Sequence, residues 1–228
     1  MDGDVKTGPG TGRPAPQART RRTRAAVIDA ARRLFVEHGY AATTIEAISE
    51  LSDTPQPTVY RLFSSKLGIL TAVLDVAIAG DDRAVAMVDR PQVRSLVDNP
   101  DPRDTLTGFA ALVGGLMVRT AAVHRVLEEA ARSDHGAAEA LAGIAQQRHD
   151  GQRRITRSLA QAGALRPGLT ERDAADIVHA LASPEVYRLL VTGRDWSGAR
   201  YERWLGSILI DQLLPATTEG EKNGTTPQ

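Results

Sequence analysis

The sequence predicts an all-α protein of about nine helices, with a small N-terminal helix-turn-helix domain followed by a larger helical domain. Two features of the composition predict this class. Alanine, leucine, arginine and glutamate recur throughout the chain, and runs of β-branched residues are scarce. Hydrophobic residues make up 42% of the 228, which is enough for a substantial core. The third observation is the stretch from Thr43 to Lys66, which has the pattern of two short helices joined by a tight turn.

The first two helices of the N-terminal domain are predicted from apolar periodicity. The first spans about residues 21–38 and ends at Gly39, because glycine commonly follows the last residue of a helix. Thr43 or Thr44 caps the second helix, since a threonine oxygen accepts a hydrogen bond from a free backbone N–H group. A turn at residues 52–54 then separates the second helix from the third.

The third helix contains two prolines at its start, and these predict where it begins. The first N–H groups of a helix have no partner within the helix, so proline costs little there. Pro57 also disfavours the helical conformation at Gln56. We therefore expect Gln56 to be the N-cap and Pro57 the first helical residue, which places both residues and Thr58 at an exposed helix tip.

The rest of the chain is predicted to form one larger helical domain. A connecting helix spans about 64–79, and a loop with a short helix near 93–97 follows it. The remaining predicted helices span about 103–120, 121–132, 137–162, 170–191 (interrupted at 183–184) and 198–214. The predicted segments are a disordered basic arm (1–20), the helix-turn-helix domain (21–66), a regulatory and dimerisation domain (67–215) and a disordered tail (216–228).

Charge and composition restrict the function. The net charge is zero, but seven arginines and one acid lie between residues 13 and 33, which indicates a local contact with a polyanion. The chain has no cysteine, so disulfides and cysteine-ligated metals are excluded. We find no signal core at the N-terminus and no apolar run long enough to span a bilayer, and we expect a cytoplasmic protein without a membrane partner.

Residues 22–75 resemble the DNA-binding domain of TetR-family transcriptional regulators. The resemblance is carried by Arg24 to Ala31, Leu34-Phe35, Gly39-Tyr40, Thr43-Thr44-Ile45, Ile48, Thr58 to Arg61, Phe63 and Ser65-Lys66. The sequence departs from the family at the turn, where Asp53 replaces the common glycine. The resemblance implies a bacterial, nucleoid-associated homodimer that binds a palindromic operator in double-stranded DNA, acts most often as a repressor, and releases the DNA when a small-molecule effector binds.

The chemistry of the third helix supports contact with DNA. A glutamine side chain donates and accepts together, which suits the N6 and N7 atoms of adenine, and a lysine at a helix start forms a clamp for phosphate. Each residue alone is more often ordinary surface, but as a set they favour DNA. The predicted DNA-binding residues are Arg22, Thr43, Thr44, Gln56, Pro57, Thr58, Tyr60, Arg61 and Lys66.

Two further sets of residues are predicted in the larger domain. Large or polar side chains on otherwise aliphatic helices are candidates for an effector pocket, although any one of them is more often core or surface. They are Phe109, Met117, His124, His149, Tyr187 and Trp196. The last two helices carry wide apolar faces that favour a dimer interface of four helices, against the alternative of ordinary core. These residues are Leu181, Leu189, Trp204, Ile208, Leu209 and Gln212.

The sequence predicts no metal site and no cofactor. Of the two candidate pocket histidines, His124 and His149, only His124 has a possible second ligand at helical spacing, Glu128 four residues later, and this weakly suggests a metal. Two alternative functions remain open. One is a DNA-binding or architectural dimer that responds to no ligand. The other is a helical enzyme, but the sequence shows no catalytic triad, paired-carboxylate motif or phosphate-binding loop that supports it.

Overall fold

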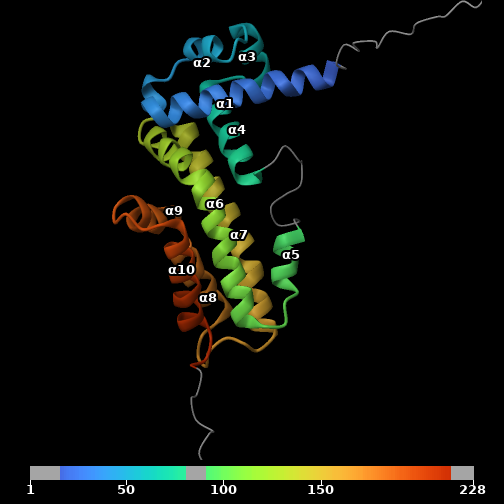
Figure 1. Ribbon diagram of the computed structural model, residues 1–228, viewed down its shortest axis with the longest axis vertical. Helices are drawn as coiled ribbons and strands as arrows, with labels where there is room; N and C mark the ends of the chain where they lie inside the picture. The colour runs from blue at the N-terminus through green and yellow to red at the C-terminus, as the bar shows by residue number, and fades with distance from the viewer. Residues whose placement is uncertain (1–15, 81–90, 217–228) are drawn as a thin grey trace, which may run out of the picture. The chain divides into compact units, whose positions relative to one another are not determined.

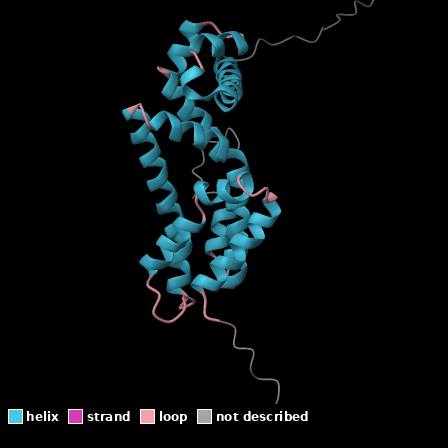
Figure 2. Cartoon of the chain, turned by 90° about the vertical axis from the view of Figure 1, so that its left-hand side faces the viewer, coloured by secondary structure: helices cyan, strands magenta, loops and turns pink. Residues whose placement is uncertain are grey.

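The computed structural model describes residues 16–80 and 91–216, and all regular secondary structure in these residues is helical (Figure 2). The all-α class is therefore confirmed. The chain divides into two compact units, Met1–Val73 and Leu74–Gln228, and each is described by itself. Most of the predicted basic arm, the predicted loop at 81–90 and most of the predicted tail lie outside the described residues.

The N-terminal unit consists of three helices and the first half of a fourth (Figure 1). They are α1 (Pro16–Ala42), α2 (Ile45–Leu51), α3 (Gln56–Phe63) and α4 (Lys66–Ala79). Each of the four contributes fully buried apolar side chains to the core of this unit. The core residues are Val27, Ala31, Phe35, Ile48, Val59, Ile69 and Leu70. Around this core, α2 packs against α1 and α3 packs against α2.

Helix α1 begins earlier than the sequence predicts. It starts at Pro16, so residues 16–20, which we expected in a disordered arm, are helical. The physical reason is that proline suits the first helical position and that the alanine and arginines after it are good helix formers. At Gly39 the backbone leaves the helical conformation, with φ 79° and ψ 175°, as predicted from the glycine.

The second unit is built around the long helices α6 and α7. Its helices are α5 (Pro91–Val97), α6 (Pro102–Ala131), α7 (His135–Gln161), α8 (Glu171–Leu181), α9 (Pro184–Tyr187) and α10 (Gly198–Leu213), and a π-helical turn, η2 (Arg188–Thr192), follows α9. Helix α6 packs between α7 and α10, while α8 contacts both α7 and α10 (Figure 1). Their shared core includes Leu106, Ile155, Leu205 and Leu209, each no more than 2% exposed.

Two helices predicted at 103–120 and 121–132 are one continuous helix, α6. No glycine or proline lies between Leu116 and Ala131, so nothing stops the helix there. Helix α6 is also long and apolar enough to cross a bilayer by length and composition, which corrects the expectation that no such run exists. Half of its most apolar window is buried inside the unit, as in a core helix of a globular domain.

The helix predicted at 170–191 is divided into three. Helix α8 ends at Leu181, and Pro184 starts α9 because its ring cannot continue the preceding helix. Ser183 caps the new helix, and its hydroxyl accepts a hydrogen bond from the Val186 N–H at 3.2 Å. The predicted interruption at 183–184 is thus confirmed. Because α9 is a separate helix, its side chains do not continue the face formed by the side chains of α8.

Candidate DNA-binding surface

The turn between α2 and α3 is fixed by a small network of hydrogen bonds. Thr44 caps α2, as predicted, by accepting a hydrogen bond from the Ala47 N–H at 3.1 Å. Asp53 takes a positive φ of 48°, a conformation that aspartate tolerates better than most residues. The Ser49 hydroxyl donates to the Thr54 carbonyl at 2.7 Å, and the Thr54 N–H donates to the Ser49 carbonyl at 3.0 Å. The reciprocal bonds hold α3 at a fixed angle to α2.

Helix α3 begins one residue before the predicted position. Its N-cap is Pro55, and Gln56 is already helical, which corrects the assignment of Gln56 as the cap. The Pro55 carbonyl accepts hydrogen bonds from the Thr58 N–H at 2.8 Å and the Val59 N–H at 3.1 Å. These bonds outweigh the steric preference that Pro57 imposes on Gln56. The exposed tip is unchanged, because Gln56 and Pro57 still lie in the first turn.

The two sides of α3 differ sharply in burial. Val59 and Phe63 are buried in the core of the N-terminal unit, whereas Gln56, Pro57 and Arg61 are exposed and Tyr60 is 49% exposed. An exposed tyrosine on a short helix leaves its ring and hydroxyl free to meet another molecule's surface. The arrangement gives a helix with one anchored side and one polar, accessible side, which is the geometry needed to enter a major groove.

The other predicted DNA contacts differ in exposure. Arg22 on α1 and Thr44 before α2 are exposed, and Thr58 is half-buried beside the exposed tip. Leu51, an apolar residue at the end of α2, is 46% exposed.

Thr43 and Lys66 do not belong to the reading surface, which corrects two predictions. Thr43 is buried, and its hydroxyl donates to the Gly39 carbonyl at 2.8 Å. The Lys66 ammonium donates to the carbonyls of Tyr40 at 2.8 Å and Thr43 at 3.0 Å, and lies 4.3 Å from the centre of the Tyr40 ring. Lys66 therefore donates hydrogen bonds to backbone carbonyls at and just after the end of α1 instead of presenting its charge to phosphate.

The predicted effector residues do not converge on one cavity. Phe109, Met117 and Tyr187 are buried in the packed core of the second unit, and the Tyr187 ring meets Tyr201 edge-on at 4.9 Å. Trp196 is half-buried beside Trp204 at 6.0 Å. Cavities of about 530 and 430 Å³ lie in the same unit, and none of the six predicted residues lines either one. The two are lined by Pro100, Asp101, Pro102, Arg103, Ala164, Leu214 and Pro215, and by Arg94, Val97, Asp98, Arg154, Arg157, Ser158 and Gln161.

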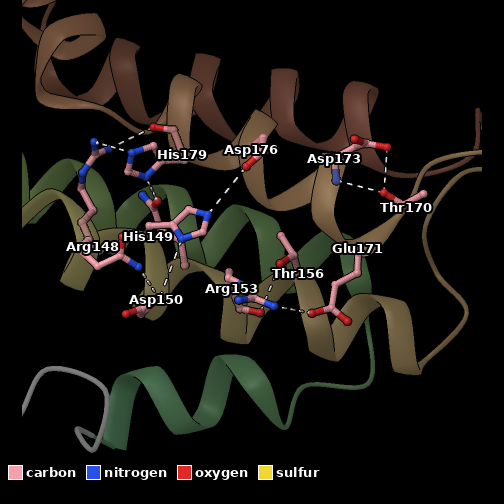
Figure 3. Close-up of polar contacts among 12 residues, drawn as sticks. Arg148, His149, Asp150, Arg153, Thr156, Thr170, Glu171, Asp173, Asp176 and His179 are labelled. Carbon is pink, nitrogen blue, oxygen red and sulfur yellow. Dashed lines mark hydrogen bonds and ion pairs between the residues drawn. The ribbon is translucent and has the colours of Figure 1, made fainter.

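His149 lies in a polar seam between α7 and α8 (Figure 3). Its ring meets the ring of His179 edge-on at 5.2 Å, and its Nε2 lies 3.7 Å from Asp176. The Arg148 guanidinium lies 3.2 Å from the His179 Nε2, and the His179 Nδ1 lies 3.0 Å from the Gln152 Oε1. Arginine can only donate, so Nε2 accepts and Nδ1 carries the proton. Burial lowers the pKa of His179, and Arg148 and His149 lower it further.

His124 lies in a second polar cluster, with Glu128 on α6 and Glu185 on α9. Burial lowers the pKa of His124, while the two glutamates act in the opposite direction. Burial raises the pKa of Glu185, but hydrogen bonds from its own backbone and from Ser183, together with the positive charges of His124 and Arg148, lower it below its ordinary value. Sequence reasoning found the first two residues from their helical spacing. It missed Glu185, because no pattern in the sequence brings the start of α9 to this part of α6.

The predicted dimer residues are divided between core and surface. Leu209 is fully buried inside its own unit, so its assignment to an interface is wrong for this chain. The residues Leu181, Trp204 and Ile208 are partly buried against the core, and Gln212 is half-buried. Leu189 is 66% exposed on the π-helical turn. A large apolar side chain with this exposure gains free energy if a second surface covers it.

Comparison with known proteins gives a consistent match for the N-terminal unit. Residues 27–73 match the model of the bacterial regulatory proteins of the tetR family. The HTH-type transcriptional repressor ComR of Escherichia coli is 42% identical over 52 residues, which are 23% of this chain and 25% of ComR. The chain thus matches about a quarter of the length of this curated relative.

Solved structures resemble the chain over most of its length. SmeT, the repressor of the Stenotrophomonas maltophilia multidrug efflux pump SmeDEF, has a TM-score of 0.62 at 20% identity, covering 92% of this chain and 98% of SmeT. The transcriptional regulator FadR of Bacillus subtilis, solved with stearoyl-CoA, has a TM-score of 0.66 at 16% identity, covering 82% of this chain and 97% of FadR. At these identities the likeness shows a shared fold.

Proposed function

We propose that the chain is a member of the tetR family of bacterial regulatory proteins, whose model matches residues 27–73, and that it is a cytoplasmic transcriptional repressor that binds a palindromic operator as a homodimer and responds to a small molecule. The observation that carries the proposal is the polar, exposed side of α3, where Gln56, Pro57, Tyr60 and Arg61 stand opposite the buried Val59 and Phe63. The relatives support it, since ComR and SmeT are both named as repressors.

Contacts with base edges are assigned to the tip of α3. Gln56 is exposed in its first turn, where a side-chain amide reaches adenine, and Pro57 and the Thr58 methyl offer apolar contact to a thymine methyl. Contacts with phosphate are assigned to Tyr60, Arg61, Thr44 and, from α1, Arg22. The buried Thr43 and the engaged Lys66 are left out of this proposal.

Selection of bound DNA from a random pool tests the assignment of Gln56. The Gln56→Ala variant is expected to lose preference at one base position in each half-site, worth about 1–3 kcal/mol, and to keep it elsewhere. Gln147→Ala changes another exposed glutamine, on α7, and serves as the matched control. An unaltered selected motif for Gln56→Ala would remove Gln56 from the reading surface.

The dimer is assigned to the surface that includes Leu189, Leu181, Trp204, Ile208 and Gln212. A charged side chain at the centre of an apolar interface leaves a desolvated charge without a partner. We therefore expect Leu189→Glu to shift the chain from dimer to monomer in analytical ultracentrifugation. Leu51→Glu alters a second exposed leucine, in the other unit, and is expected to leave the dimer intact. A Leu189→Glu variant that stays dimeric at low concentration refutes this interface.

One observation favours a second candidate, a DNA-binding dimer that responds to no ligand. Phe109, Met117 and Tyr187, which were expected to line an effector pocket, fill the core instead. The two candidates differ in one measurement. Loss of operator binding on addition of an effector supports the ligand-responsive repressor. If the second unit serves only to dimerise the chain, operator affinity stays unchanged across a broad panel of small molecules.

A further inference from the structure

The cluster of His124, Glu128 and Glu185 in the second unit brings together groups that ligate metals. One ligand atom from each of the three residues lies within 4.8 Å of the other two. His124 and Glu128 lie one turn apart on α6, and Glu185 comes from the first turn of α9. An ion at their centre would thus join two helices that are separated along the chain by the whole of α7 and α8.

A buried nitrogen without a hydrogen bond points into this cluster. His124 is only 7% exposed, and its Nδ1 atom has no hydrogen-bond partner. Nδ1 lies 3.2 Å from the Glu128 Oε1, but the alignment is not that of a hydrogen bond. A buried polar atom that stays unpaired costs free energy, and native proteins satisfy nearly all such atoms. A bound cation would use the Nδ1 lone pair directly.

The size of the site selects an ion over an organic molecule. Neither of the two cavities described above is lined by His124, Glu128 or Glu185. The three side chains already lie at separations that one ion can bridge. Glu185 is exposed, so the ion can reach the buried His124 from solvent along this carboxylate.

We propose that His124, Glu128 and Glu185 bind a divalent first-row transition-metal ion, with Zn²⁺ as the representative. One imidazole and two carboxylates form a mixed nitrogen and oxygen set, which suits such ions. Three protein ligands leave one position of a tetrahedral Zn²⁺ open to water. Mg²⁺ prefers an all-oxygen shell, so the imidazole disfavours it. The proposal concerns the ion alone and does not depend on DNA binding.

Arg188 is the competitor of the ion. Its guanidinium holds both oxygens of Glu128, at 3.1 and 2.9 Å. Arg148 adds a second positive charge nearby, although it also donates to the carbonyls of His179 and Ala182 at 3.0 and 3.3 Å. A carboxylate has lone pairs for more than one partner, but a cation next to a guanidinium is repelled. Removing the Arg188 charge should therefore strengthen metal binding.

Isothermal titration of the chelator-treated full chain with ZnCl₂ tests the proposal. We expect one Zn²⁺ per chain, and affinity at least about tenfold weaker in His124→Gln and in Glu185→Gln. Glu185 is exposed, so Glu185→Gln keeps the fold even if the buried His124→Gln does not. Arg188→Gln is expected to bind Zn²⁺ more tightly than the unmodified chain, an effect opposite in sign to loss of a ligand.

The chain contains a matched control for the site. His135 and Glu139 on α7 have the same helical spacing, 3.2 Å apart, but are 89% and 71% exposed. His135→Gln should leave Zn²⁺ affinity unchanged, and MgCl₂ should not compete. Absence of Zn²⁺ binding by the unmodified chain overturns the proposal. Unchanged Zn²⁺ affinity in Glu185→Gln also overturns it. If, in addition, His149→Gln loses Zn²⁺ affinity, the ion lies in the polar seam between α7 and α8.

Discussion

Lys66 provides the sharpest test of how the N-terminal unit is held together. The substitution Lys66→Met keeps most of the aliphatic stem and removes the ammonium. That ammonium donates to the carbonyls of Tyr40 and Thr43 at 2.8 and 3.0 Å and lies 4.3 Å from the Tyr40 ring. A hydrogen bond to a charged group contributes about 1.5–3 kcal/mol, and a cation–π contact about 0.5–1 kcal/mol.

The three contributions of Lys66 do not simply add. One half-buried ammonium makes all of them, and water replaces part of what is lost. We expect Lys66→Met to lower the free energy of unfolding of the N-terminal unit by about 2–4 kcal/mol. Since about 1.4 kcal/mol corresponds to a factor of ten, the protected amides of α2 and α3 should exchange hydrogen roughly 30-fold to 1,000-fold faster.

The same variant separates a structural role from contact with DNA. A lysine on phosphate contributes about 0.9 to the slope of log affinity against log salt concentration. The Lys66 ammonium faces carbonyls, so we expect the slope of the folded Lys66→Met fraction to be unchanged. Arg61→Ala should show the reverse, with a lower slope and normal hydrogen exchange. Normal exchange together with a slope reduced by about 0.9 in Lys66→Met would refute the structural role of Lys66.

Two further predictions concern backbone crowding and acid stability. Gly68→Ala would place a Cβ atom against the Phe63 carbonyl oxygen, so thermal melts should show a loss of stability. Gly143 is also in a helix, but nothing lies within 4 Å of a Cβ built there, so Gly143→Ala should gain about 1 kcal/mol of stability. The folded-state pKa of His179 is lowered below its ordinary value of 6.5, so the unfolded chain binds more protons than the folded one. Stability should therefore fall as pH drops through and below 6.5, and His179→Gln should flatten that decline in urea titrations at several pH values.

Much of the N-terminal unit is predictable because its signals are local. A cap, a turn residue and two prolines act within one or two turns, and they place α2 and α3 to within one residue. The same reasoning separates the buried Val59 and Phe63 from the exposed Gln56 and Arg61, since a short amphipathic helix has one buried face. The error at the N-cap is also local. The preference that Pro57 imposes on Gln56 is weaker than the hydrogen bonds that the Pro55 carbonyl accepts.

The partners of long cationic side chains are not predictable in this way. Lys66 was expected to bind phosphate because it stands at a helix start, but its partners are Tyr40 at the end of α1 and Thr43 just after it. Arg119 on α6 likewise donates to the Ala77 carbonyl in α4 at 3.1 Å. Periodicity tells which face of a helix a residue occupies. It does not tell which distant segment packs against that face. A long, flexible lysine or arginine side chain can donate to any carbonyl that the fold places within its reach.

The same reasoning explains why the metal-ligand cluster could not be read from the sequence. His124 and Glu128 are visible as a pair on one helix, yet so are His135 and Glu139, and spacing alone ranks the two pairs equally. Tertiary structure distinguishes them. The break at Ser183 and Pro184 starts a new helix, and that helix delivers Glu185 to the first pair, whereas the second stays exposed. The break itself is predictable from Pro184, but the packing of the new helix against α6, which brings Glu185 to His124, is not.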